Sequence, residues 1–173
     1  ISDSKLNNGH LRAGSQSADE VAHLMRSLGA AFGAKYKSDE TSVDSDKAIN
    51  WIDNMTILSA SKLKDYNENN IYNAIKDGKL VYGRGNMGRK KVLGITVSYS
   101  GGHAWVYDGC ITATSKSDGK SKKLFHCNWG WYGEYNGYFL SKSFNSMAGA
   151  EITDTEENNI TRGTDGDFKY NLE

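Results

Sequence analysis

One histidine of this sequence lies where a catalytic base could work. His103 follows two glycines and opens a run of aromatic and β-branched residues, GGHAWVYDGC, at positions 101–110. The glycines would let the backbone of a substrate come close to the imidazole. Histidine changes its charge near neutral pH and can act as a general base, but a lone histidine more often makes a structural hydrogen bond. The residues around His103 therefore decide between these interpretations.

A catalytic histidine needs a neighbour that fixes its tautomer and ring orientation. The segment HCNWGWYGEYNGYF at 126–139 offers Asn128 for this role. If Asn128 faces His103 across neighbouring strands, alternation points Cys127 to the opposite face, and it points Cys110 there as well. We therefore expect neither cysteine to be the nucleophile, because a thiol must come within hydrogen-bond reach of its base.

The two cysteines are better explained by packing. SKSDG at 115–119 is typical of a hairpin loop, and Cys110 and Cys127 are symmetric about it. They could be cross-strand neighbours, either as packed thiols or as a disulfide. A weaker alternative makes one of them the nucleophile. A zinc site built from His103, His126 and Cys127 is disfavoured, because the last two alternate sides of a strand. We expect no metal and no other cofactor.

The expected order of elements is helices first and strands afterwards. Apolar residues at helical spacing predict helices over 17–34, 45–54 and 69–77. Ser17 with Glu20 fits a capping box for the first helix, and Asn69 is a possible cap for the third.

Beyond Gly78 the sequence changes to short aromatic and β-branched runs separated by Gly, Ser, Asn and Asp. This pattern predicts strands, so the expected fold class is α+β with an antiparallel sheet. Residues 86–91 and 141–166 are expected to be surface loops, and residues 1–16 a loose lead-in to a folded portion at 17–173. The expected strands cover 80–82, 92–99, 103–112, 123–129, 138–140 and 168–172.

Composition narrows the classes of partner. The 21 Lys and Arg balance the 21 Asp and Glu, and no block of one sign dominates. We therefore expect neither nucleic acid nor an anionic membrane as partner. No run approaches the roughly 20 apolar residues of a membrane helix, so no membrane segment is expected. The chain begins ISDSKLNN without Met, which suggests a processed product or a piece of a longer chain.

The motifs GGHAWVYDG and HCNWGWYGEYNGYF together resemble the streptopain-like cysteine peptidases, family C10 of the papain-like clan. In that family a Gly-Gly-His-Ala strand carries the catalytic histidine, and an Asn-Trp-Gly-Trp-Gly segment follows it. The segments SADEVAHLMRSLGAAFGAKY, NIYNAIKDGKLVYGRG and FKYNLE are also similar to family elements. The resemblance covers most of 17–173 and implies a papain-like cysteine peptidase fold, of which this chain is the histidine-bearing part.

The resemblance also implies roles for single residues. His103 would be the catalytic base and Asn128 the matching residue of the Asn-Trp-Gly-Trp segment. Trp129 would be its neighbour at the active site, and Gly102 would line the substrate groove.

The sequence departs from the family pattern in two places. The family's cysteine lies upstream of the segment that matches 17–34, whereas no Cys precedes position 110 here. About a dozen residues, roughly 86–98, are inserted before the histidine. We expect a secreted or cell-envelope thiol endopeptidase that acts on proteins or peptides, with its cysteine on a separate N-terminal chain of the same precursor. The alternatives are a truncated chain and an inactive relative kept for binding or inhibition.

Overall fold

The structure is a computed structural model that describes residues 6–7, 10–11, 14–38, 41–131, 133–153 and 166–173. The predicted α+β class is confirmed: in the described ranges, three helices and a five-stranded antiparallel sheet form most of the structure. The chain divides into two compact units, residues 1–64 and residues 65–173. Most of the expected lead-in at 1–16 lies outside the described residues.

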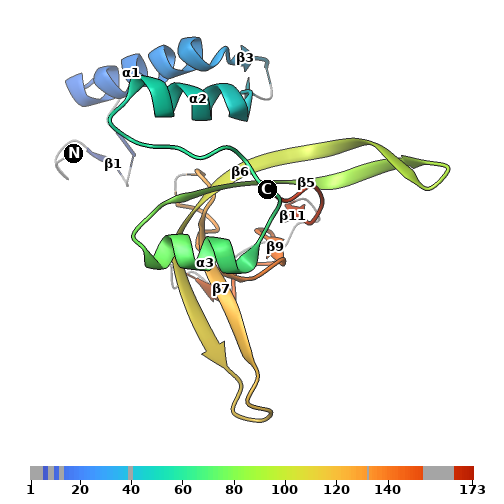
Figure 1. Ribbon diagram of the computed structural model, residues 1–173. Coiled ribbons are helices and arrows are strands. Elements are labelled where there is room, and N and C mark those ends of the chain that lie inside the picture. The colour runs from blue at the N-terminus through green and yellow to red at the C-terminus, as the bar shows by residue number, and fades with distance from the viewer. Residues whose placement is uncertain (1–5, 8–9, 12–13, 39–40, 132, 154–165) are drawn as a thin grey trace. The chain divides into compact units, whose positions relative to one another are not determined.

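The first unit is built on two helices (Figure 1). The side chain of Ser15, and not that of Ser17, caps the first helix by accepting a hydrogen bond from the Ala18 N–H. Asp44 caps the second helix in the same manner. The rings of Phe32 and Trp51 meet edge to face at 5.6 Å between centroids and join the helices. The elements of this unit are β1 (Leu6–Asn7), β2 (His10–Leu11), α1 (Gln16–Phe32), β3 (Lys35–Tyr36), β4 (Thr41–Ser42) and α2 (Ser45–Met55).

The second unit carries the sheet, in the strand order β10-β8-β7-β6-β5. Its one helix among the described residues, α3, packs against β5, β6 and β7. Asn67 caps α3 by accepting from the Asn70 N–H, so the cap lies two residues before the predicted Asn69. The elements are α3 (Glu68–Lys76), β5 (Val81–Val92), β6 (Ile95–Thr114), β7 (Ser121–Asn128), β8 (Gly137–Leu140), β9 (Phe144–Asn145), β10 (Ile152–Thr153) and β11 (Asp167–Phe168).

Aromatic side chains fill the core beneath this sheet. Each large ring removes a substantial apolar area from water, and the rings meet at tilted or edge-to-face angles. The cluster is completed by Ile71 of α3 and by the buried thiol of Cys127. Its buried aromatic members are Trp105, Tyr107, Phe125, Trp129, Phe139, Phe144 and Phe168.

Two segments that were expected to be surface loops, 86–91 and 141–166, differ from that prediction in part. Residues 86–91 belong to β5, where Gly88 lies opposite Ser100 and Lys90 opposite Ser98. Polar residues are tolerated at 89–91 because backbone pairing with β6 forms the ribbon there without a buried face, whereas Met87 is partly buried against the core. Within 141–166, Phe144 and Ser146 are fully buried. Short polar runs around single buried residues carry no periodicity, so the sequence pattern missed them; residues 154–165 lie outside the described part.

A β-bulge at Asp108 changes which side chains face the core. Tyr107 lies opposite Cys127, but Gly109 lies opposite His126, so Asp108 is an extra residue on β6. The alternation of β6 therefore reverses after Tyr107. Strict alternation along positions 103–110 was wrong for this reason.

Gly137 at the start of β8 is expected to be intolerant of a side chain. Its φ is +153°, and an added Cβ would lie 2.4 Å from the Ile152 carbonyl oxygen. Gly133 has a φ of +91° but nothing within 4 Å of an added Cβ. Gly137→Ala should lower the free energy of unfolding by roughly 2–4 kcal/mol, and Gly133→Ala by about 1 kcal/mol. Urea unfolding of both variants measures the difference, and equal losses would show that the backbone contact is unimportant.

Candidate active site

His103 lies on β6 opposite Gly85 of β5, with its ring on the core face of the sheet. Three aromatic rings surround it. The centroid of Trp131 lies 4.5 Å from that of His103, that of Phe168 5.5 Å away, and that of Trp129 6.1 Å away. The imidazole is half-buried, so water is partly excluded from one side of it.

One hydrogen bond fixes the tautomer of this imidazole. His103 Nε2 lies 2.9 Å from the carbonyl oxygen of Trp129. A carbonyl oxygen can only accept, so Nε2 carries the hydrogen and donates it. In the neutral ring the other nitrogen, Nδ1, then holds the lone pair. His103 is therefore oriented as a base whose accepting atom is Nδ1.

The Trp129 carbonyl is itself held in place by the segment that follows it. The Trp129 N–H donates to Asn136 Oδ1 at 3.0 Å, and the indole Nε1–H donates to the Tyr135 carbonyl at 3.0 Å. The Trp129 side chain is 1% exposed. These contacts fix both the backbone and the ring of Trp129, so its carbonyl is a rigid acceptor for His103.

Asn128 is not brought to His103. In the sheet it lies opposite Val106, on the face away from the core, and its side chain is exposed. Its Oδ1 accepts a hydrogen bond from the Gly130 N–H at 3.0 Å, which closes a turn around Trp129. The side-chain contact expected between Asn128 and His103 is thus replaced by a backbone carbonyl one residue later.

Burial lowers the pKa of His103 below its ordinary value, and the hydrogen bond to Trp129 partly opposes this shift. The folded state therefore favours the neutral imidazole, and the unfolded chain binds the proton more readily. The free energy of unfolding should fall as the pH drops below about 6.5 and through the lower pKa of the folded state.

His103→Phe should remove this part of the acid sensitivity while keeping an aromatic ring among the three that surround His103. Urea midpoints at neutral and mildly acidic pH measure the effect. A wild-type and a variant protein with the same pH dependence would contradict a buried neutral His103.

Both cysteines are free thiols, and neither contacts His103 among the described interactions. Cys110 lies opposite Phe125 and Cys127 opposite Tyr107, so the expected cross-strand pair is wrong. Because of the bulge at Asp108, both also lie on the core face, where His103 lies, and not on the opposite one.

Neither thiol serves His103, but the reason is not that they face the opposite side of the sheet. Cys127 lies opposite a residue four positions along β6 from His103, roughly 13 Å at the usual rise of a strand. Burial, and to a smaller extent Asp108, raises the pKa of the Cys127 thiol well above its ordinary value. Cys110 donates its S–H to the Tyr72 carbonyl at 3.9 Å. A fully buried, protonated thiol is a packing group and not a nucleophile.

The two glycines before His103 have separate structural reasons. Gly101 has a φ of +61°, which favours glycine. An added Cβ at Gly102 would lie 3.0 Å from the side-chain nitrogen of Asn86. Gly102 is exposed next to His103, so it leaves open the backbone that the resemblance assigns to the substrate groove.

The Peptidase C10 family model matches residues 3–139 of this chain. The chain belongs to this family. The match spans both units and includes His103, Asn128 and Trp129. A search of curated proteins finds no match.

A solved structure supports the fold of this C10 chain. The structure of active wild-type interpain A, a cysteine protease of Prevotella intermedia, matches with a TM-score of 0.52 at 18% sequence identity. The match covers 82% of this chain but 56% of the interpain A chain. This likeness supports a shared fold, and the C10 chain spans a little over half the length of its structural relative.

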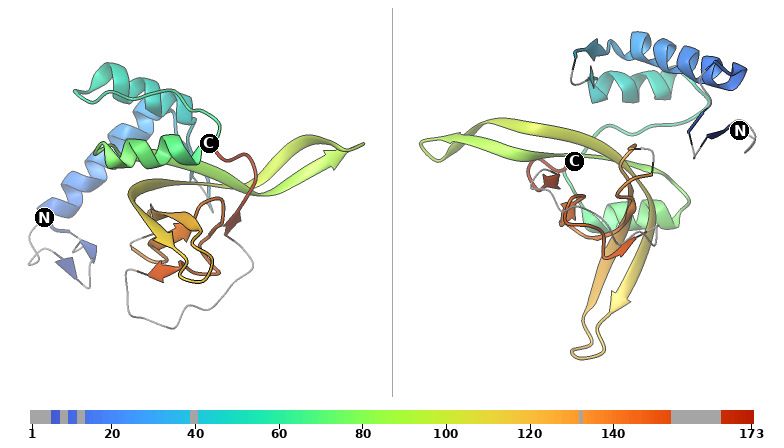
Figure 2. Two further views of the ribbon diagram at one scale, coloured as in Figure 1. Left: turned by 60° about the horizontal axis from the view of Figure 1, so that its bottom comes forward. Right: turned by 180° about the vertical axis from the view of Figure 1, so that it is seen from behind.

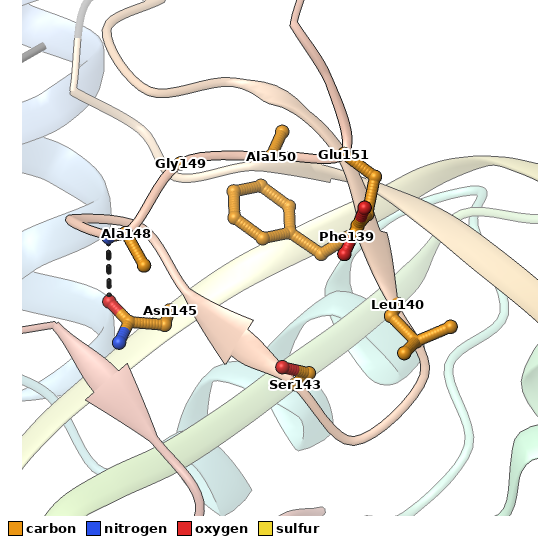
Figure 3. A pocket seen from close by; sticks show the side chains of 8 residues that line it. All are labelled: Phe139, Leu140, Ser143, Asn145, Ala148, Gly149, Ala150 and Glu151. Carbon is orange, nitrogen blue, oxygen red and sulfur yellow. Dashed lines mark hydrogen bonds between the residues drawn. The ribbon is translucent and has the colours of Figure 1, made fainter.

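Two pockets in the described part of the C10 chain lie away from His103. One, with a volume of about 290 Å³, is formed around β8 and β9, where Asn145 Oδ1 accepts from the Ala148 N–H (Figure 3). The other, of about 400 Å³, is lined by residues of α3, β6 and β7 and by Leu140 and Ser141. Neither is lined by His103, Gly102 or Trp129. The histidine therefore lies outside both pockets.

The described residues contain neither a metal-binding cluster nor a helix that could cross a membrane. They hold no group of three or more His, Cys, Asp or Glu side chains arranged to bind a metal ion. None of the helices in those residues is long and apolar enough to cross a membrane.

Trp131 and Phe168 are site residues whose role the sequence did not predict. Trp131 was not among the expected site residues, and Phe168 was expected only as part of a strand at 168–172. The NWGW spacing could have indicated that Trp129 and Trp131 both lie near the histidine. Nothing local marks Phe168, because its contact with His103 joins positions 65 residues apart in sequence.

Proposed function

We propose that this chain is the histidine-bearing part of a secreted, papain-like thiol endopeptidase whose nucleophilic cysteine lies on a separate N-terminal chain of the same precursor. The observation that carries the proposal is the hydrogen bond from His103 Nε2–H to the Trp129 carbonyl. It leaves Nδ1 as the accepting atom on a half-buried ring, which is the arrangement a general base requires. Membership of the C10 family supports the same reaction class.

The chemistry follows from that tautomer. The partner cysteine gives its proton to Nδ1 of His103, and the thiolate attacks the carbonyl carbon of a peptide bond. While Nδ1 is protonated, both ring nitrogens donate, and the Trp129 carbonyl continues to accept from Nε2. His103 then passes the proton to the leaving amine. Water, deprotonated by His103, hydrolyses the thioester and restores the thiol.

The remaining parts of the site are proposed to come from both chains. Donors for the oxyanion would lie beside the partner cysteine. On this chain, exposed Gly102 would line the substrate groove, and Trp129 would act as a positioning residue through its carbonyl. Asn128 is proposed to act only indirectly, by closing the turn that sets the direction of that carbonyl.

The proposed nucleophile lies outside residues 1–173, because neither thiol within this chain suits that role. Its sequence has two cysteines, Cys110 and Cys127, and both are packed away from His103. Intact mass and N-terminal sequencing of the native protein test the arrangement. A second, cysteine-containing polypeptide should copurify with the 19.1 kDa chain. Native material that consists of the 19.1 kDa chain alone would contradict the proposal.

An inactive binding or inhibitory module is the second candidate, favoured by the same lack of a nucleophile. The two candidates differ in what purified native material does to a denatured protein substrate. The peptidase should cleave it and should be blocked by a thiol-directed inhibitor. A module should bind without cleaving, and that result would overturn the enzymatic proposal.

A further inference from the structure

The β5–β6 hairpin extends beyond the sheet of the second unit. Pairing of β6 with β7 begins at Val106, so the residues of β6 before it pair only with β5. Residues 88–100 therefore form a two-stranded ribbon, which Figures 1 and 2 show projecting from the body of this unit. Part of this ribbon is the segment, roughly 86–98, that was expected from the sequence to be inserted relative to the family pattern.

The end of this ribbon, which we call the ribbon tip (residues 92–99), exposes large apolar side chains. Leu93 is 98% exposed and Ile95 is 70% exposed. Val92, Val97 and Tyr99 are between 46% and 54% exposed. Single exposed apolar residues are ordinary, but five within eight positions concentrate apolar side chains at the end of the ribbon, which is typical of an interaction surface.

The turn at the ribbon tip is built at a conformational cost. Leu93 and Gly94 both have positive φ, +50° and +83°. A two-residue turn of this kind normally uses Asn-Gly, because a bulky side chain is disfavoured in the left-handed region. Leu93 thus occupies a strained position and is almost fully exposed. Folding of the hairpin explains neither property.

The hairpin between β6 and β7 offers an internal comparison. Its loop, 115–120, also projects, and it is polar throughout. The hydroxyls of Ser115 and Ser117 are hydrogen-bonded to each other, and the Lys120 N–H donates to Asp118. An exposed hairpin in this protein can therefore be made from ordinary polar turn residues. Of these two hairpins, the one between β5 and β6 has an apolar end and the one between β6 and β7 does not.

A band of cations lies next to the ribbon tip. Arg89, Lys90 and Lys91 are exposed on β5, and no Asp or Glu occurs from Gly78 to Tyr107. Arg89 lies over the ring of Tyr170 at 4.5 Å, which leaves the two lysines nearest the tip. The balanced charge of the whole chain conceals this local excess.

We propose that the ribbon tip docks on an anionic lipid surface. From Leu93 to Lys90 the ribbon spans roughly 10 Å, so Leu93, Val92 and Ile95 would reach the acyl boundary while the lysines lie at phosphate depth. Tyr99, further from Leu93 along the ribbon, suits the interfacial region. An acidic pocket on another protein could also bind the lysines. It would not require apolar residues at the end of the ribbon with cationic residues behind them along its length.

Vesicle flotation with the full chain tests the proposal without any measurement of peptidase activity. The wild type should bind vesicles of phosphatidylcholine with about 30% phosphatidylglycerol at least fivefold better than pure phosphatidylcholine, and added salt should reduce the difference. Lys90→Glu with Lys91→Glu should lower binding to the anionic vesicles at least tenfold. The matched change Lys116→Glu with Lys122→Glu, on the polar hairpin, should alter it less than about twofold.

Leu93→Asn gives a result that a destabilised variant cannot imitate. Asparagine tolerates positive φ, so the variant should unfold at a higher urea concentration and yet bind anionic vesicles at least about fivefold less. Equal binding of the wild type to both kinds of vesicle, or undiminished binding of Leu93→Asn, would overturn the proposal. Docking to a protein instead of a lipid would appear as the first of these outcomes.

Discussion

If the chain works in the proposed two-chain peptidase, replacing His103 with alanine there is expected to lower kcat/KM for a peptide substrate by at least about 10³-fold. The reason is that, in the proposed mechanism, Nδ1 of His103 both accepts the cysteine proton and protonates the leaving amine. The fold should persist, because the buried rings of Trp129 and Phe168 still pack on Trp105. Steady-state kinetics, with circular dichroism as a check of folding, measure the effect.

His126→Ala is the matched control for this experiment. His126 also lies on a central strand and is mostly buried, but its Nδ1 pairs with Asp108 and it contacts Tyr138. It lies on the face away from the core, so the proposed chemistry does not use it. Turnover should stay within about threefold of the wild type. Comparable losses in the two variants would remove the special role of His103.

Replacing Trp129 with alanine should produce the largest loss of stability, roughly 3–5 kcal/mol in the free energy of unfolding. Its 1% exposed ring contacts Trp105, Phe139 and Phe168, so its removal leaves a cavity in the middle of the aromatic cluster. Urea unfolding measures the loss. A cost below about 1 kcal/mol would show that the core does not depend on this ring.

Trp129→Phe separates packing from positioning. Phenylalanine keeps an aromatic ring in the cluster but lacks the Nε1–H that donates to the Tyr135 carbonyl. We expect a smaller loss of stability, about 1–2 kcal/mol, together with a fall in kcat because the carbonyl facing His103 is less firmly held. If kcat is unchanged while stability falls, Trp129 has a structural role only.

The position of His103 could be predicted because its signal is local. Two glycines, a histidine and an aromatic strand occur together, and the strand and its hairpin partner follow from period-two alternation. The three helices were found for the same reason, with cap positions shifted by two residues. Sequence patterns placed these elements well because each depends on residues close in sequence.

The rest of the site depended on features without a local signature. Every residue has a backbone carbonyl, so nothing in the sequence indicated that Trp129, and not the Asn128 side chain, would accept from His103. One extra residue at Asp108 reversed the facing of Cys110, and a bulge of this kind has no reliable sequence pattern. The two-residue turn at Leu93-Gly94 was missed because leucine is unusual there.

The most direct test of the two-chain account is to map the cysteine that reacts in the native enzyme. A thiol-directed irreversible peptidase inhibitor is added to native material, and the modified residue is located by peptide mass spectrometry. The account predicts one adduct on a cysteine of a separate copurifying polypeptide, formed much more slowly in His103→Ala, with Cys110 and Cys127 unmodified. An adduct on Cys110 or Cys127 that abolishes activity would contradict it.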